Sequence, residues 1–417
     1  MPAVTTPILW KNFFSLGFVQ VVNSLLQLLV MPYVIARIGV DQYGVVAVAQ
    51  VLMFYLSTFS EYGFNQTGTR GVSLNRENGL ALSGIFSRVM LTKLVLCVAS
   101  FVVLLLLAAV VPFIRDHFVL YCMAFVYVPG MALIPAWYLQ GHERMRELAV
   151  VNLSSRLLFV LLVFLFIKNA RDAALYVFFL GLCSLLPGLI STLSTWKKDS
   201  LQWMPVSRKE INALLKEGWH ITASNLSMNI IQYGNIFILR LFANDLVTGY
   251  YGVAERIFFS LKQGLVVFSQ AAYPRVCVLA ADGAGAVQQF YRRYFRPFFL
   301  MVLMGSALVA LAAPYILGFF LPHTDPGAVI LLRMFCMVLP LICLNIPGSL
   351  ALLAFDKRKK YFRIYGSAVL VSVLLNFAGA YYAEARGTLA AILGTELFIT
   401  TGVTIAWLRL VQSKNTA

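Results

Sequence analysis

The sequence is poor in charged side chains. Only 12% of its 417 residues are Asp, Glu, Lys or Arg, whereas a soluble globular protein carries about 25%. Hydrophobic residues make up 60% of the chain, and the mean hydropathy is +0.81. A surface with so little charge cannot be solvated by water over its whole area. The composition therefore excludes a set of soluble domains and favours a chain that has lipid as its solvent.

The sequence also lacks the patterns on which most enzymes and metal proteins depend. It contains no phosphate-binding glycine loop and no CxxC pair. Its histidines are scattered without the spacing of metal ligands; they are His117, His142, His220 and His323. We therefore expect no cofactor, no metal site and no enzyme activity, with a membrane glycan polymerase or ligase as the alternative. The cysteines lie in or beside apolar stretches, and we expect free buried thiols.

Long apolar stretches occupy most of the chain. A helix that crosses a bilayer needs about 20 mostly apolar residues. The stretches that meet this length are residues 12–36, 43–63, 85–112, 118–139, 148–167, 172–194, 211–239, 246–270, 298–321, 328–354, 362–383 and 388–410. The stretch 211–239 is polar for a span, and prolines interrupt 328–354. We predict an all-α integral membrane protein of about 12 transmembrane helices joined by short loops.

The distribution of Lys and Arg predicts the orientation of these spans. If the N-terminus is cytoplasmic, 22 of the 33 Lys and Arg fall on the inner side and six on the outer side, which leaves five inside spans. Cytoplasmic loops of membrane proteins carry an excess of Lys and Arg. We therefore predict that both termini are cytoplasmic. The same bias explains the net charge of +16 without a nucleic-acid partner.

The two halves of the sequence are similar to each other. At an offset of 205 residues, polar and basic positions coincide: Lys11 with Lys216, Gln20 with Asn225, Gln27 with Gln232, Arg70 with Arg275, and Arg88 with Arg293. This pattern predicts two six-helix bundles, residues 1–205 and 206–417, related by a pseudo-two-fold axis along the membrane normal. Many transporters are built from such repeats and carry their substrate between the halves.

Ionisable residues inside spans are the candidates for a functional site. A charge at the centre of a bilayer costs at least a few kcal/mol unless it faces protein or water. Five bases and three acids occupy such positions: Lys93, Arg156, Arg256, Lys262 and Arg333, with Glu61, Glu255 and Glu396. Each base could instead be paired internally or reach the interface. The surplus of bases predicts a hydrated cavity that suits an anionic substrate.

Amide side chains form stripes on the first and seventh spans. Their spacings of three and four residues place them on one helical face. The residues are Gln20, Asn23 and Gln27 in the first span, and Asn225, Asn229, Gln232 and Asn235 in the seventh. Such amides either form hydrogen bonds between helices or bind sugar hydroxyls, because an amide both donates and accepts. Both interpretations remain open from sequence.

Several short motifs resemble a known family. They are Leu9-Trp10-Lys11-Asn12-Phe13, Glu61-Tyr62-Gly63-Phe64-Asn65 with Thr69-Arg70, Pro135-Ala136-Trp137-Tyr138-Leu139-Gln140-Gly141, and Ala272-Tyr273-Pro274-Arg275-Val276. Together they resemble the Wzx-type O-antigen flippases, in the polysaccharide transporter family of the multidrug/oligosaccharidyl-lipid/polysaccharide exporter superfamily. The resemblance extends over most of the chain and is strongest over residues 9–145.

The resemblance implies a function and partners. It implies a flippase that moves an undecaprenyl-diphosphate-linked oligosaccharide across a Gram-negative inner membrane by alternating access. It also implies an ion gradient as the energy source, contact with membrane lipids, and the O-antigen polymerase machinery as a partner. Alternatives are a MATE-like drug exporter and a flippase for the peptidoglycan precursor. The sugars of the oligosaccharide and the oligomeric state do not follow from the sequence.

Roles for individual residues follow from this hypothesis. Arginine binds phosphate groups by paired hydrogen bonds. We expect Lys93, Arg156, Arg256, Lys262 and Arg333 to line the path of the head group. Arg70 and Arg275 would bind the pyrophosphate at entry, unless they only anchor the inner helix ends. Glu255, Glu396 and Glu61 are the candidates for exchange of H⁺ or Na⁺.

Overall fold

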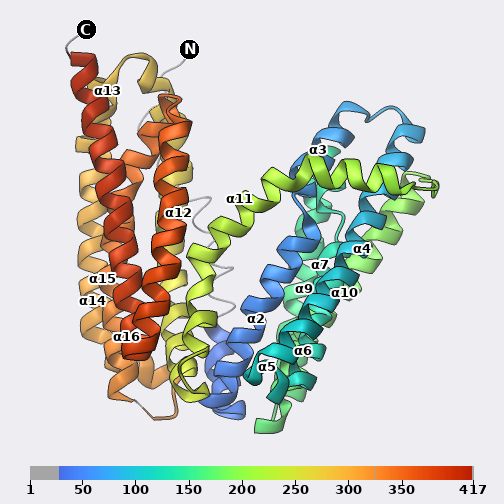
Figure 1. The fold of residues 1–417 in the computed structure, drawn as a ribbon, viewed down its shortest axis with the longest axis horizontal. Helices are drawn as coiled ribbons and strands as arrows, with labels where there is room; N and C mark the ends of the chain where they lie inside the picture. Colours follow the sequence, from blue (N-terminus) through green and yellow to red (C-terminus); the bar gives the residue numbers. More distant parts are fainter. Residues whose placement is uncertain (1–27, 324, 416–417) are drawn as a thin grey trace. The chain divides into compact units, whose positions relative to one another are not determined.

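All regular secondary structure is helical over the residues that the computed structural model describes, which are 28–323 and 325–415 (Figure 1). Nine of the described helical stretches are long and apolar enough to cross a membrane. The first predicted span, 12–36, lies mostly outside the described residues, which include the helix Leu28–Ile38 from its end. The prediction of an all-α membrane fold is confirmed.

The chain packs into two compact units. The first unit is residues 37–237, and the second is residues 1–36 together with 238–417. These limits follow the packing of helices rather than the sequence repeat. The domains 1–205 and 206–417, which we inferred from the repeat, stay a prediction.

The first unit contains the elements from α2 to α11. Their bounds are α2 Val40–Glu61, α3 Phe64–Leu74, α4 Gly79–Val110, α5 Pro112–Asp116, α6 Phe118–Phe125, α7 Tyr127–Leu133, α8 Ala136–Gly141, α9 Met145–Phe166, η1 Ala170–Asp172, α10 Ala173–Lys198 and α11 Arg208–Arg240. Helix α10 packs against α6, α7 and α9, and α2 packs against α4 and α7. Close approach of α7 and α10 depends on glycine, because a Cβ at Gly130 would lie 2.8 Å from the backbone of Leu185.

The predicted span 118–139 consists of three short helices, α6, α7 and α8. Proline has no N–H and restricts the residue before it to extended conformations. Accordingly, α7 ends at Leu133, Ile134 is extended (φ −69°, ψ 116°), and α8 begins after Pro135. The break leaves backbone carbonyls that the continuous helix would have used. These carbonyls become acceptors for side chains of other helices.

A sharp corner joins α2 to α3. Tyr62 (φ 46°) and Gly63 (φ 70°) both have left-handed backbone conformations, which glycine adopts at little cost. The corner turns α3 away from α2 and onto α8. Helix α11 covers the corner closely, since a Cβ at Gly218 would lie 2.7 Å from the carbonyl oxygen of Tyr62.

The polar span predicted at 211–239 is the helix α11, and it lies along α2. The Tyr55 hydroxyl donates to the carbonyl oxygen of Asn229 (3.0 Å). The Asn229 amide donates to the Thr58 hydroxyl (3.3 Å). The bond from Asn229 thus satisfies part of the polarity that makes this span weak by hydropathy.

The second unit contains the elements from α12 to α16. Their bounds are α12 Asp245–Ala281, α13 Ala284–Phe290, the π-helix η2 Tyr291–Phe295, α14 Arg296–Phe320, α15 Pro326–Ala354 and α16 Arg358–Asn415. Helix α15 packs against α12, α14 and α16, which lie side by side with it (Figure 1).

Helix α16 is two antiparallel helices joined by a tight turn. Its helical geometry is interrupted at Ala383 and Glu384. The backbones on either side of this turn meet so closely that a Cβ at Gly379 would lie 2.3 Å from the carbonyl oxygen of Gly387. Farther along, Gly402 contacts Ile364. The spans predicted at 362–383 and 388–410 are therefore confirmed as two separate passes.

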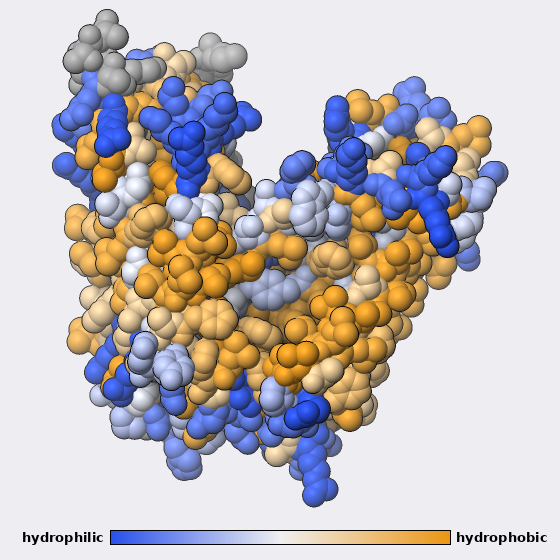
Figure 2. All heavy atoms as spheres, viewed as in Figure 1, coloured by the Kyte–Doolittle hydropathy of each residue, from blue (hydrophilic) through white to orange (hydrophobic). Residues whose placement is uncertain are grey.

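The surface of each unit suits a bilayer. Within each unit, apolar side chains cover the middle of the visible face and hydrophilic ones gather towards two ends (Figure 2). Large apolar side chains are highly exposed, among them Leu106 (62%), Leu311 (74%) and Leu374 (71%). Apolar patches of this extent do not face water in soluble monomers. The chain is a multi-pass membrane protein.

Candidate functional site

Lys93 lies at the helix break between α7 and α8. Its side chain on α4 is only 1% exposed, and its ammonium group donates to the carbonyl oxygen of Ala132 (3.3 Å). The hydroxyl of Thr192 donates to the next freed carbonyl, that of Leu133. A buried ammonium group requires such partners. Lys93 therefore stabilises the fold in this conformation, and its predicted contact with substrate stays a prediction.

Glu61 provides the negative charge nearest to Lys93. It ends α2, interacts electrostatically with Lys93, and accepts a hydrogen bond from the Asn65 amide (3.3 Å). One residue earlier, the hydroxyl of Ser60 shares a hydrogen bond with that of Ser100 on α4 (3.0 Å). The interface of α2 and α4 is thus a polar stripe inside a membrane-spanning unit. Glu61 remains a candidate for ion exchange.

The two most distinctive motifs of the first half meet where α3 packs on α8. The hydroxyl of Thr69 donates to the carbonyl oxygen of Trp137 (3.1 Å), and the hydroxyl of Ser73 donates to that of Gly141 (3.2 Å). A Cβ at Gly68 would lie 2.9 Å from the indole ring of Trp137. Sequence analysis missed this contact. The glycines in each motif could have indicated this contact, because close helix packing needs small residues.

Salt bridges hold the same region together on its polar side. Arg76, which follows α3, donates to the carbonyl oxygen of Gly141 (2.7 Å) and to Glu143 (2.7 Å). Arg144 bridges Glu147 and Asp199 at 2.7 and 2.6 Å. Lys198 also binds Glu147 (2.7 Å). We call Arg76, Glu143, Arg144, Glu147, Lys198 and Asp199 the latch.

The latch changes the ionisation of groups outside the spans. The hydrogen bond from Arg144 to Glu147 raises the pKa of the Arg144 guanidinium, with burial acting in the opposite direction. Burial lowers the pKa of the neighbouring His142, and the cations Arg144 and Arg76 add to this effect while Asp199 opposes it. The neutral imidazole is therefore the favoured form of His142 in the folded protein.

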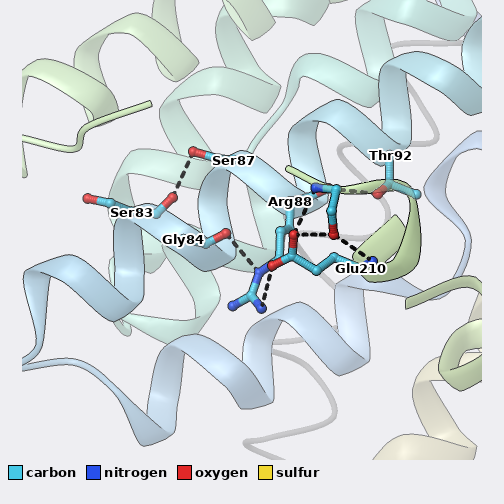
Figure 3. Close-up of polar contacts among 7 residues, drawn as sticks. Ser83, Gly84, Ser87, Arg88, Thr92 and Glu210 are labelled. Carbon is cyan, nitrogen blue, oxygen red and sulfur yellow. Dashed lines mark hydrogen bonds and ion pairs between the residues drawn. The ribbon is translucent and has the colours of Figure 1, made fainter. Parts of the chain in front are cut away.

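The segment that leads into α11 is fixed to α4. Backbone N–H groups of Gln202 and Met204 donate to the hydroxyls of Ser83 and Ser87, both at 3.0 Å. Arg88, one residue further, lies 3.6 Å from Glu210 on α11 and donates to the carbonyl oxygen of Gly84 (3.0 Å) (Figure 3). Hydrogen bonds from the Ser207 backbone and hydroxyl lower the pKa of Glu210, and Arg88 contributes.

A second polar cluster lies inside the second unit. Glu396 on α16 accepts a hydrogen bond from the Asn345 amide on α15 (2.7 Å). The Thr400 hydroxyl donates to the other end of that amide, its carbonyl oxygen (2.5 Å). Lys262 on α12 interacts electrostatically with Glu396 and, more weakly, with Glu255. We call Lys262, Asn345, Glu396 and Thr400 the Glu396 cluster.

Lys262 differs from Lys93 in its surroundings. It is half-buried, lies 5.7 Å from the ring centre of Phe259, and forms no salt bridge with either acid in the described part of the chain. Glu255 is 7% exposed, and Arg256 beside it is half-buried. Lys262 thus lies near Glu396 and Glu255 without a salt bridge to either acid.

The remaining predicted residues are distributed over both units. In the first unit, Arg70 is exposed on α3 and Arg156 is half-buried on α9. In the second, Arg275 is half-buried on α12, while Arg333 is exposed on α15 and donates to the carbonyl oxygen of Ala310 (3.1 Å). Within either unit taken alone, the predicted cations do not form one site. Their joint role as a path for the head group stays a prediction.

The predicted glycan-binding amides have mixed environments. Asn225 is exposed on α11, Asn229 is bonded to Thr58, and Gln232 donates to the hydroxyl of Tyr233 (2.8 Å). Gln20, Asn23 and Gln27 lie outside the described residues. Of the amides predicted on α11, Asn225 is therefore one that a ligand could reach without replacing a contact between helices.

The fold is that of known multi-pass transporters. An inward-facing MATE family multidrug transporter of the MOP superfamily superposes with a TM-score of 0.73 over 94% of this chain and 96% of its own, at 15% identity. The lipid II flippase MurJ in an inward closed conformation gives 0.72 over 94% of this chain and 87% of its own, at 14% identity. At these identities the likeness shows the fold alone.

The sequence places the chain in a particular family. Residues 9–278 match the family described as "Polysaccharide biosynthesis protein", and the protein belongs to this family. Two relatives are named "Putative O-antigen transporter". The one from Escherichia coli (strain K12) is 26% identical over 94% of each chain. The one from Shigella dysenteriae is 25% identical over 93% of this chain and 97% of its own.

Proposed function

We propose that the protein is a flippase for undecaprenyl-diphosphate-linked O-antigen oligosaccharides. It moves the head group from the cytoplasmic to the periplasmic leaflet by alternating access. The observation that carries this proposal is the similarity to named O-antigen transporters along 94% of the chain. The shared fold with a lipid II flippase, whose name also states a lipid-linked substrate, supports it.

The balance of charge inside the spans favours this substrate over a cationic drug. The fold alone does not separate the two, because MATE transporters share it. Five bases and three acids lie inside the spans. A pyrophosphate is anionic and suits a surplus of Lys and Arg, whereas a cation exporter needs carboxylates to receive its substrate. The protein is therefore a transporter of an anionic head group, and the isoprenoid tail stays in the lipid.

The same proposal includes the orientation and the setting of the protein. The excess of Lys and Arg in alternate loops supports a cytoplasmic location for both termini, and the relatives from Escherichia coli and Shigella dysenteriae support a Gram-negative inner membrane. The oligosaccharide would then be delivered on the side where the O-antigen polymerase machinery uses it.

The proposal also includes coupling of transport to an ion gradient. We place it at the Glu396 cluster and Glu255, with Glu61 as the counterpart in the first unit. Glu396 has an amide donor at 2.7 Å and an ammonium group near it. Binding of H⁺ or Na⁺ at Glu396 would change the charge that Lys262 experiences. Transport would then respond to an imposed gradient of one of these ions.

Complementation of a strain that lacks its O-antigen flippase tests the proposal. The wild-type chain should restore the lipopolysaccharide ladder on a gel. Neutralising Arg256 or Arg333, as Arg256→Gln or Arg333→Gln, should abolish the ladder at unchanged membrane abundance, and Arg256→Lys should restore part of it. Arg386→Gln, an exposed residue between the two passes of α16, is the matched control and should leave the ladder intact.

Two results would contradict the proposal. A wild-type chain that is inserted in the membrane but restores no ladder with any O-antigen would reject O-antigen transport. Rescue of a strain depleted of its lipid II flippase, in the absence of any effect on O-antigen, would instead assign the peptidoglycan precursor as the substrate. For coupling, transport in liposomes that ignores both a pH gradient and a sodium gradient would remove Glu396 from that role.

A further inference from the structure

One end of the second unit carries a high density of positive charge. The segments 271–297, 355–363 and 405–412 hold ten Lys and Arg and two acids, a formal charge of +8 (ten minus two). The segments at the other end, 240–246, 320–326 and 383–387, hold two bases and three acids, a formal charge of −1. Helices α14 and α15, of 25 and 29 residues, separate the two ends. We call the +8 end the basic end.

Aromatic contacts bring the basic segments together. The ring of Tyr291 in η2 lies 6.0 Å from that of Trp407 near the end of α16. Trp407 in turn lies 6.2 Å from Phe355, which directly precedes the basic turn. The hydroxyl of Tyr291 also donates to the carbonyl oxygen of Pro347 (2.8 Å). The cations that follow Tyr291 and Phe355 along the chain therefore belong to one surface.

The cations of this surface are accessible and largely without acidic partners. Lys357, Lys359, Lys360 and Arg363 are exposed, as are Arg292 and Arg293. Among the described residues of the basic end, the only salt bridge joins Arg358 to Asp356, both more than three-quarters exposed. An exposed pair of this kind contributes little. The positive charge is therefore available to a ligand.

An exposed apolar stripe begins beside these cations on α16. Phe362 (69% exposed), Leu370 (69%) and Leu374 (71%) follow one another along α16. At 3.6 residues per turn, these three residues lie within an arc of about 120° around the helix, the width of an ordinary apolar stripe. A cationic surface that continues into an apolar face matches a molecule with an anionic head and acyl chains.

We propose that the basic end is a docking surface for the head groups of anionic phospholipids of the surrounding bilayer. Clusters of Lys and Arg beside a membrane span bind anionic lipids at about a fivefold gain per cation. The transported substrate fits this surface less well. Its pyrophosphate carries about two negative charges, one per phosphate, and cannot balance a charge of +8. Several monoanionic phospholipids can, and their acyl chains would cover the stripe that begins at Phe362.

Lipid binding by the purified full-length chain tests this inference without any measurement of transport. Native mass spectrometry at low salt would compare phosphatidylglycerol with phosphatidylcholine. The variant Lys357→Gln/Lys359→Gln/Lys360→Gln should lose phosphatidylglycerol affinity by about 100-fold, the product of three fivefold losses, with phosphatidylcholine unchanged. The matched control is Lys197→Gln/Arg208→Gln/Lys209→Gln in the first unit, where three exposed cations are also removed. It should change affinity by less than about threefold.

The outcomes separate the inference from its rivals. Equal binding of both lipids by the wild type, or unchanged phosphatidylglycerol binding by the triple variant, would overturn it. An equal loss in the control variant would assign the effect to net charge alone and would also overturn it. Displacement of the lipid by micromolar inorganic pyrophosphate would identify a site for free phosphate instead. A normal elution volume of both variants on size exclusion would show that each is folded.

Discussion

The two units use the same kinds of charged residue in opposite ways. In the first unit, Lys93 donates to a backbone carbonyl inside the protein, and Arg144 bridges two acids at its polar end. In the second, Lys262 lies near two acids without a salt bridge in the described chain, and the basic turn that begins at Lys357 is exposed. Lys93 and Arg144 hold the first unit together, whereas Lys262 and the exposed cations of the basic turn are not held in this way, although Arg240 of the second unit pairs with Asp245 (2.6 Å).

Short helices explain why the first unit needs its cations. Helices of 11 and six residues, such as α3 and α8, are too short to be stable alone. Their free carbonyls and their connecting turns require donors from elsewhere. Lys93 and Arg76 donate to the carbonyl oxygens of Ala132 and Gly141, and Arg144 joins its connecting turn to Asp199. The second unit consists mostly of long helices, in which most backbone carbonyls have partners within the helix.

The largest expected effect comes from the two lysines inside the spans. Lys93→Met should lower the free energy of unfolding by about 3–5 kcal/mol, because it leaves a buried carbonyl and Glu61 without their cation. Lys262→Met should change stability by less than about 1 kcal/mol but abolish O-antigen export. Thermal unfolding in detergent and complementation would measure the two effects. Equal destabilisation by both variants would remove the distinction between the units.

Close packing of α3 on α8 gives the next largest effect. A Cβ at Gly141 would lie 2.6 Å from Val72 and 3.1 Å from the carbonyl oxygen of Thr69. Gly141→Ala should therefore destabilise the protein by about 1–3 kcal/mol through overpacking. Gly71→Ala on α3 is the control, because its Cβ would meet Ile85 at an ordinary 3.6 Å. A lower melting temperature for Gly71→Ala than for Gly141→Ala would refute the packing argument.

The salt bridges of the two polar ends provide a smaller and more direct comparison. Arg144 has a side chain 16% exposed and binds two acids, so Arg144→Gln should cost about 1–2 kcal/mol. Arg358 is 82% exposed, and Arg358→Gln should leave the melting temperature unchanged. High salt should reduce the difference only in part, since partly buried pairs are screened less. A stable Arg144→Gln variant would show that the latch is not structural.

The smallest effect concerns pH and the latch. Burial lowers the pKa of His142 below its ordinary value of 6.5, so the unfolded chain binds a proton more readily than the folded one. The resulting stabilisation is present above pH 6.5 and is lost as the pH falls through the lowered pKa. It should stay below about 1 kcal/mol because the imidazole is partly exposed. His142→Asn should flatten the fall of the melting temperature below pH 6.5, and an unchanged acid dependence would exclude His142 as its source.

Some features of the site were accessible from sequence because they depend on neighbouring residues. The stripe of amides on α11 follows from helical spacing. Prolines were a weaker guide: the predicted span 118–139 is broken at Pro135, whereas the interruption predicted in 328–354 is wrong, because α15 continues through Pro340 and Pro347. The sequence also marked Lys93 and Lys262 as unusual, because both lie inside apolar stretches. The sequence could not show that the two lysines have different surroundings. Lys93 donates to a carbonyl on α7, whereas Lys262 lies near carboxylates on α12 and α16.

By itself, the sequence determined the membrane class and most span positions, and it predicts which side carries the excess of positive charge. Each of these depends on the composition of consecutive residues, because a bilayer fixes the length and the polarity of a segment that crosses it. Only the tertiary structure decided which charges are partners. Lys93 meets Ala132 across 39 residues, Arg144 meets Asp199 across 55, and Arg76 meets Glu143 across 67. Such pairs depend on how helices pack and turn, which local composition does not encode.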